Sequence, residues 1–187
     1  MDERNLSDRE LVGAYLGGDA RAFDQLYERY RRPLYGYLNQ LVPGRAALAD
    51  DLFQQTWVKV LDALPRSQDQ QKFIGWMFRI AHNLAMDNFR TSGTGRGEGD
   101  VALEEIEEVI AHEGMDAAEL VADGELRAAL AEVIGRLGPE QKEVLLLRQQ
   151  GIPFKEIAEI QKTSINTVLG RMHYAVQNIR KELREWL

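Results

Sequence analysis

The strongest constraint on the fold of this chain is the segment 153–175, PFKEIAEIQKTSINTVLGRMHYA. The spacing of its apolar residues predicts a short helix over 154–160, followed by a tight turn at 161–163. Ser164 is then expected to begin a second helix, because its hydroxyl can accept a free backbone N–H. Two short helices joined by a tight turn are the layout of a helix-turn-helix, whose second helix lies in the major groove of DNA.

The second helix of this segment has two different faces. Apolar residues recur at three- and four-residue spacing from Val168 to Trp186 and predict a buried stripe. Two packed helices of a bundle that bind nothing show the same pattern, so the pattern alone leaves both interpretations open. The opposite face carries side chains that suit phosphates and base edges: Asn166, Thr167, Gly170, Arg171 and Tyr174.

The composition excludes several functional classes. The chain has 187 residues and no cysteine, which excludes a disulfide scaffold, a thiolate metal site and a cysteine nucleophile. His82, His112 and His173 show no metal or triad spacing, so we expect no metal, no cofactor and no enzymatic activity. No apolar run approaches the roughly 20 residues of a membrane span, and the N-terminus does not resemble a signal peptide. We therefore expect a cytoplasmic protein without membrane insertion.

The net charge of −7 is concentrated in the middle of the chain. Residues 1–95 hold 12 basic and 12 acidic residues, residues 96–125 hold 1 and 11, and residues 126–187 hold 10 and 7. The helix-turn-helix part is therefore mildly basic, which favours a polyanionic ligand. The Gly-rich run TSGTGRGEG at 91–99 leads into this acidic part. Together they predict a flexible linker over 93–124.

The residues on either side of this linker predict two small all-α domains, 1–92 and 125–187. In the first, Ser7 is expected to begin a helix with a capping box to Glu10, and Asp50 to cap or open a third helix. In the second, two further helical patterns precede the helix-turn-helix and complete a four-helix domain. The sequence contains no strand-like alternation of any length.

Two helices of the first domain carry candidate binding faces. The helix at 50–64 has an outer surface that suits a partner protein, although a merely solvated face has the same pattern: Asp50, Asp51, Gln54, Gln55, Val58 and Lys59. The helix at 72–90 follows a polar loop, and it combines charged, amide and aromatic groups that can hold unstacked bases. A tryptophan in a core is the commoner case, so that face also has a structural interpretation: Trp76, Arg79, Asn83, Asp87 and Arg90.

Four segments, taken in order, carry a resemblance to a known family. They are GDARAFDQLYERYRRPLYGYL, ADDLFQQTWVKVLDAL, FIGWMFRIAHNLAMDNFR, and AEVIGRLGPEQKEVLLLRQQGIPFKEIAEI with the helix-turn-helix that follows it. Together they resemble a bacterial RNA polymerase sigma factor of the sigma-70 family, extracytoplasmic-function (ECF) group. They are similar, in turn, to the start of the family's first domain, its clamp-binding helix, its −10-reading helix and its −35-reading second domain.

The resemblance implies a subunit that binds core RNA polymerase and directs promoter-specific initiation without catalysis of its own. The outer face of 50–59 would contact the clamp of the largest polymerase subunit, and the second domain the flap of the second-largest. The 76–90 face would capture a base of the melted −10 element, and an anti-sigma factor would cover both domains. The −35 duplex would be bound by residues of the second domain: Arg148, Lys155, Ser164, Asn166, Thr167, Gly170, Arg171 and Tyr174.

The sequence departs from the family's pattern in the recognition segment. Lys162 stands where the family usually has a glycine, Leu169 where it often has a lysine, and Tyr174 where it often has an arginine. A non-glycine residue in a left-handed turn position costs about 1 kcal/mol, which favours a different turn here. Fewer phosphate contacts weaken binding to DNA and flatten its salt dependence.

Two other functions remain as alternatives. The depleted basic face and the acidic linker favour a sigma-mimicking protein that sequesters an anti-sigma factor. An ordinary helix-turn-helix repressor or activator would need a dimer on a palindromic site, and it leaves residues 1–90 unexplained.

Overall fold

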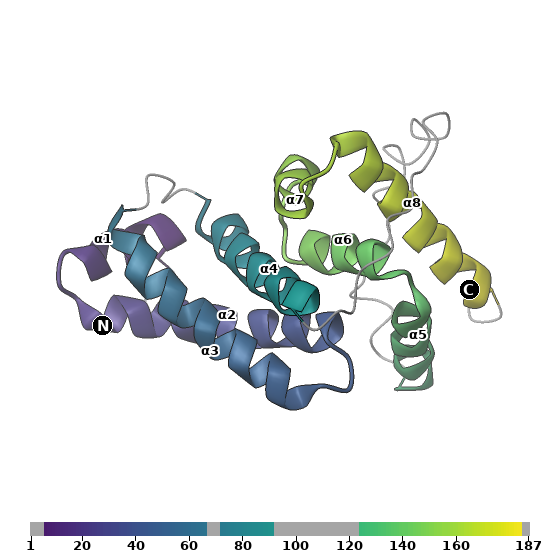
Figure 1. Ribbon diagram of the computed structural model, residues 1–187, viewed down its shortest axis with the longest axis horizontal. Helices are drawn as coiled ribbons and strands as arrows, with labels where there is room; N and C mark the ends of the chain where they lie inside the picture. The colour runs from purple at the N-terminus through teal and green to yellow at the C-terminus, as the bar shows by residue number, and fades with distance from the viewer. Residues whose placement is uncertain (1–5, 67–71, 92–123, 185–187) are drawn as a thin grey trace. The chain divides into compact units, whose positions relative to one another are not determined.

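The computed structural model describes residues 6–66, 72–91 and 124–184, and within these ranges every regular element is helical (Figure 1). The chain divides into two compact units, Met1–Gly95 and Arg96–Leu187. The expected all-α fold is thus confirmed. The linker expected at 93–124 lies outside the described residues, except for Gly124 at the start of a helix.

The first unit is organised around its longest helix, α2, which packs against the three other α-helices of the unit. Its inward side carries Leu26, Leu34 and Leu38, which are fully buried. Their spacing of eight and four residues places them on one side of the helix. The elements are α1 (Asp8–Leu16), α2 (Ala20–Leu41), α3 (Ala46–Ala63), the short 3-10 helix η1 (Leu64–Arg66) and α4 (Phe73–Thr91).

Side-chain caps begin α1 and α2. Ser7 Oγ accepts the backbone N–H of Glu10 at 3.4 Å, and the Glu10 carboxylate accepts the backbone N–H of Ser7 at 2.8 Å. The expected capping box is therefore confirmed. Asp19 caps α2 by accepting the backbone N–H of Arg21 at 3.0 Å.

The expected start of the third helix at Asp50 is wrong. Helix α3 begins at Ala46, and Arg45 before it makes no side-chain cap. The run AALA that precedes Asp50 consists of strong helix formers, so the helix extends through it without a cap. Asp50 instead accepts a hydrogen bond from the Tyr35 hydroxyl at 2.7 Å and thereby ties α3 to α2.

A cluster of polar side chains fastens α1 to α2. The guanidinium of Arg29 donates to the Asp8 carboxylate at 2.5 Å and to the backbone carbonyl of Leu6 at 2.7 Å. The hydroxyl of Tyr30 donates to the other oxygen of Asp8. Burial, followed by this bond to a carboxylate, raises the pKa of Tyr30 well above its ordinary value.

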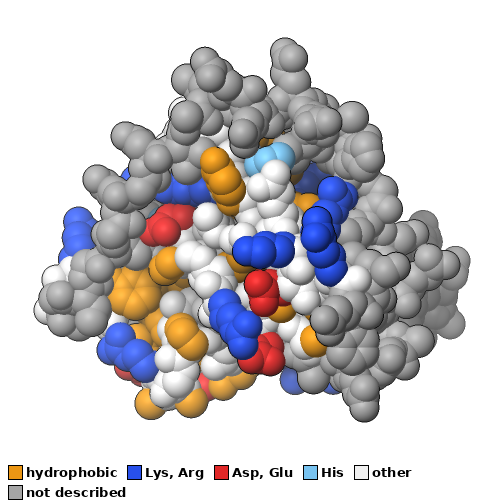
Figure 2. All heavy atoms as spheres, turned by 90° about the vertical axis from the view of Figure 1, so that its right-hand side faces the viewer, with side chains coloured by type: hydrophobic (Ala, Val, Ile, Leu, Met, Phe, Trp, Pro, Cys, Tyr) orange, Lys and Arg blue, Asp and Glu red, His pale blue; other side chains and the backbone are white. Residues whose placement is uncertain are grey.

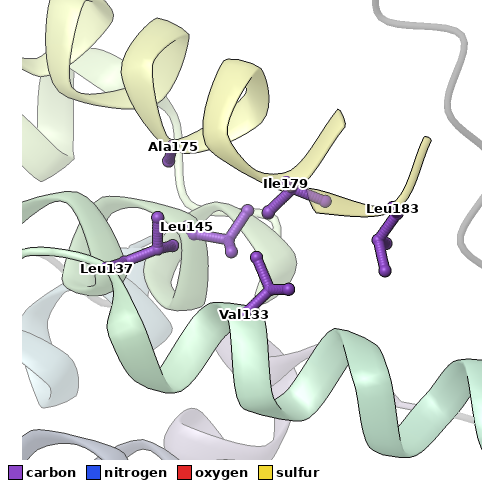
Figure 3. Close-up of a cluster of buried hydrophobic side chains, with 6 residues drawn as sticks. All are labelled: Val133, Leu137, Leu145, Ala175, Ile179 and Leu183. Carbon is purple, nitrogen blue, oxygen red and sulfur yellow. The ribbon is translucent and has the colours of Figure 1, made fainter. Parts of the chain in front are cut away.

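The second unit contains four helices: α5 (Gly124–Arg136), α6 (Pro139–Gln149), α7 (Phe154–Gln161) and α8 (Ile165–Glu182). Helix α8 packs against each of the other three. Figure 3 shows the cluster where α5, α6 and the second half of α8 meet, with Val133 and Leu145 facing Ile179 and Leu183. None of the described helices is both long and apolar enough to cross a lipid bilayer.

Replacing Tyr30 by phenylalanine should lower the free energy of unfolding of the first unit by about 1–3 kcal/mol at neutral pH, because a hydrogen bond to a charged acceptor is lost. Above about pH 10 the unfolded chain loses the phenol proton while the folded chain keeps it, since the pKa of Tyr30 is raised in the folded state. The difference in free energy of unfolding between the wild type and Tyr30→Phe should therefore be constant below that pH and decrease above it. Urea unfolding followed by tryptophan fluorescence measures both effects.

Tyr35→Phe provides the matched control, because it removes the same type of bond at an exposed position. Equal losses of unfolding free energy for the two variants would contradict the role given to the Asp8 cluster, the hydrogen bonds of Arg29 and Tyr30 to Asp8.

Candidate nucleic-acid and polymerase interfaces

Helices α7 and α8 form the expected helix-turn-helix. Lys162 ends α7 with φ 54° and ψ 46°, and the backbone N–H of Thr163 returns to the carbonyl of Ala158 at 3.0 Å. Ser164 Oγ accepts the backbone N–H of Thr167 at 3.1 Å, so the expected cap of α8 is confirmed. The expectation of a different turn is wrong, because Lys162 adopts the left-handed conformation itself.

Packing explains why the strained lysine is tolerated. Ile157 and Ile160 of α7 and Val168 of α8 are fully buried. Burying each such side chain contributes about 1.5–3 kcal/mol, which exceeds the cost of about 1 kcal/mol at Lys162. The tertiary contact of α7 with α8 therefore decides the geometry of the turn.

The outer side of α8 begins with exposed Asn166, followed by half-buried Thr167, Arg171 and Tyr174. Asn166 is thus the most accessible of the amide and hydroxyl groups expected to reach base edges. Gly170 is buried, which corrects its placement on the exposed face. A glycine on a helix has no side chain that reaches past its larger neighbours, so it offers no exposed group of its own.

The two hydroxyls at the start of α8 are already engaged with each other. Ser164 Oγ and Thr167 Oγ1 lie 2.8 Å apart, in addition to the bond from the Thr167 backbone. Ser164 was expected to bind DNA, and the structure shows that its hydroxyl caps the helix.

The positive groups expected to bind phosphates come from three helices. Lys155 is exposed in the first turn of α7. Arg148, in the last turn of α6, places its guanidinium 5.0 Å from the ring centre of Phe154. This cation–π contact restrains the side chain. Figure 2 shows one face of the molecule, on which Lys and Arg side chains lie among acidic, polar and apolar ones.

The exposure of Ile165, the first residue of α8, was not expected from the sequence. Its side chain is 45 % exposed beside Asn166. Ile165 lies three residues before buried Val168. An apolar residue at that spacing fits the buried stripe, so nothing in the sequence indicated that Ile165 is exposed. An exposed apolar group at this place suits a thymine methyl group in the major groove.

Helix α4 brings its five predicted residues onto one side. At 3.6 residues per turn they fall within about 80° of one another around the helix axis. Trp76 is half-buried, with its ring centre 6.0 Å from that of Phe73, and the Asp87 carboxylate is paired with Arg90. Along this stripe the aromatic group lies near the start of α4 and the ion pair near its end. The stripe consists of Trp76, Arg79, Asn83, Asp87 and Arg90.

Helix α3 exposes all six residues that were expected to bind a partner protein. Val58 is notable, because this apolar residue is 58 % exposed. The rings of Tyr35 and Phe53 lie edge to face at 5.6 Å between α2 and α3. The exposed set is Asp50, Asp51, Gln54, Gln55, Val58 and Lys59.

Comparisons with known proteins agree with this geometry. The family models for Sigma-70 region 2 and Sigma-70, region 4 match residues 26–94 and 127–179. The RNA polymerase sigma-H factor of Pseudomonas aeruginosa is 28% identical over 185 residues, which are 96% of this chain and 95% of the relative. The ECF RNA polymerase sigma-E factor of Haemophilus influenzae is 27% identical over 184 residues, covering 96% of each chain.

A solved structure of CnrH in complex with the cytosolic domain of CnrY superposes with a TM-score of 0.61 at 27% identity. The likeness covers 95% of this chain and 97% of that chain. Because the two family models together match more than half of the chain, it belongs to the sigma-70 family of RNA polymerase sigma factors, in the ECF group.

Lys162→Gly should stabilise the α7–α8 pair by up to about 1 kcal/mol, because glycine adopts the left-handed conformation without the Cβ clash. Amide hydrogen exchange of α7 and α8 in the full chain measures the gain. Lys162→Ala is the control, since it removes the same charge and keeps the clash. Equal protection in the glycine and alanine variants would show that Lys162 is not strained.

Proposed function

We propose that this chain binds core RNA polymerase through its first domain and directs it to promoters that both domains recognise. The observation that supports the proposal most strongly is the presence of region 2 and region 4 in one chain, with a complete helix-turn-helix in the latter. We assign residues 1–92 to polymerase and −10 binding and residues 125–187 to −35 binding. The chain acts by binding, and polymerase supplies the phosphodiester chemistry.

The proposed division of labour follows the exposed faces. The exposed side of α3 contacts the clamp of the largest polymerase subunit, and the second domain contacts the flap of the second-largest. The α4 stripe holds an unstacked base of the −10 element, with Trp76 as the stacking group. Lys155, Arg148 and Arg171 contact −35 phosphates, which position the domain without reading sequence.

An anti-sigma factor is the proposed regulator. The similar protein CnrH was solved with another protein, the cytosolic domain of CnrY, bound to it. Exposed apolar and aromatic groups on α2 and α3, Tyr35 and Val58, suit a protein partner. Such an inhibitor and polymerase would compete for the same side of the first domain.

Asn166→Ala is expected to weaken holoenzyme binding to its preferred −35 duplex by about 10- to 100-fold, because an asparagine that pairs with a base edge contributes about 1–3 kcal/mol of discrimination. The measurement selects duplexes from a random library with the wild-type holoenzyme and then compares affinities. Asn178→Ala on the same helix is the matched control, since Asn178 is also exposed but lies more than three turns further on. Equal losses for the two variants would contradict the assignment of Asn166.

Val58→Asp should weaken binding to core polymerase by at least about tenfold, because it replaces the exposed apolar side chain of the proposed contact by a charge. Leu16→Asp makes the same type of change at the exposed end of α1, outside the proposed contact, and should leave core binding intact. Fluorescence anisotropy of the labelled chain with core polymerase distinguishes the two. Unchanged binding by Val58→Asp would remove α3 from the polymerase interface.

A further inference from the structure

Three polar side chains from three helices form a continuous chain of hydrogen bonds in the second unit. Glu143 of α6 is fully buried. The side-chain amide of Gln161, the last residue of α7, donates to the Glu143 carboxylate at 2.9 Å and to the backbone carbonyl of Glu140 at 3.3 Å. The guanidinium of Arg171, on α8, donates to the amide oxygen of Gln161 at 2.9 Å.

The chemistry of the two ends determines how the amide of Gln161 is oriented. A backbone carbonyl, such as that of Glu140, only accepts hydrogen bonds, and a guanidinium only donates them. The amide must therefore present its NH₂ group to Glu143 and its oxygen to Arg171. A flipped amide would place oxygen against oxygen at one end and N–H against N–H at the other. The two acceptors on α6, the Glu143 carboxylate and the Glu140 carbonyl, thus hold Gln161 with its amide oxygen toward Arg171.

This arrangement has a consequence for Arg171. One N–H of its guanidinium is held by Gln161, and four of its five donors are not used by that bond. A flexible arginine side chain carries about 2 kcal/mol of rotamer entropy, so a side chain already held loses less when it meets a ligand. Because the amide is neutral, its bond to Arg171 leaves the positive charge of the guanidinium in place.

We propose that Gln161 is a positioning residue that holds the guanidinium of Arg171 ready for a phosphate of the −35 duplex. The inference rests on the proposed function and deepens it. Gln161 touches no DNA in this account and acts only through Arg171. Glu143 in turn holds the amide of Gln161, so a buried carboxylate in α6 affects the affinity of a residue on α8.

Gln161→Leu keeps the approximate size of the side chain and removes both hydrogen bonds. Binding of the holoenzyme to a promoter fragment selected from a random library should weaken by about three- to tenfold, and the slope of log K against log salt should lose up to about one phosphate contact. A purely structural role for Gln161 would leave the salt slope unchanged.

A double-mutant cycle separates the two roles. If Gln161 acts through Arg171, Gln161→Leu should have no further effect on DNA affinity in an Arg171→Ala background. In a Lys155→Ala background, where another positive group is removed, Gln161→Leu should weaken DNA binding by as much as it does in the wild type. Additive losses in both backgrounds would overturn the inference.

If Gln161→Leu does not fold, hydrogen exchange of α7 and α8 would show the loss of protection. A second variant then tests the same inference. Glu143→Gln keeps the shape of the side chain but weakens the acceptor that holds the Gln161 amide, and its smaller loss should also vanish in the Arg171→Ala background. An additive loss there again overturns the inference. If the wild-type holoenzyme selects no fragment at all, the proposed function fails and this inference fails with it.

Discussion

The packing of α7 against α8 is the contact on which the DNA-binding part of the molecule depends. Helix α7 packs against α8 while Ile157, Ile160 and Val168 are fully buried, and the free energy gained by this burial exceeds the strain at Lys162. The left-handed lysine in turn allows Ser164 to cap α8. Because these steps are linked, the direction in which Asn166 projects is set by an apolar contact inside the domain.

The first domain presents its functional groups in a different way. Long helices bury apolar side chains on one side, and their outer sides then display groups at helical spacing without any special backbone geometry. Polar ties such as the Asp8 cluster and the Tyr35–Asp50 bond fix one helix to the next. A surface formed in this way suits broad contacts with a protein and with an unstacked strand, where stacking and area matter more than a single bond.

Sequence patterns predicted the local features well because their causes are local. Ser7 and Ser164 cap helices through bonds to residues three positions on, and such spacing is visible in the sequence. The start of α3 was misplaced at Asp50, since a helix that begins with an alanine-rich run needs no cap. The exposure of Ile165 and the burial of Gly170 depend on neighbouring elements and turns, which periodicity does not show. The Glu143–Gln161–Arg171 chain joins residues 10 and 18 positions apart and has no sequence signature.

Run-off transcription with core polymerase on a random promoter library, at moderate and at low salt, would show whether this chain directs promoter-specific initiation. We expect initiation that depends on this chain and enriches one −35 and one −10 element. Polymerase binding without selective initiation at either salt would contradict the claim and favour a protein that mimics a sigma factor. Absence of polymerase binding would contradict the account as a whole.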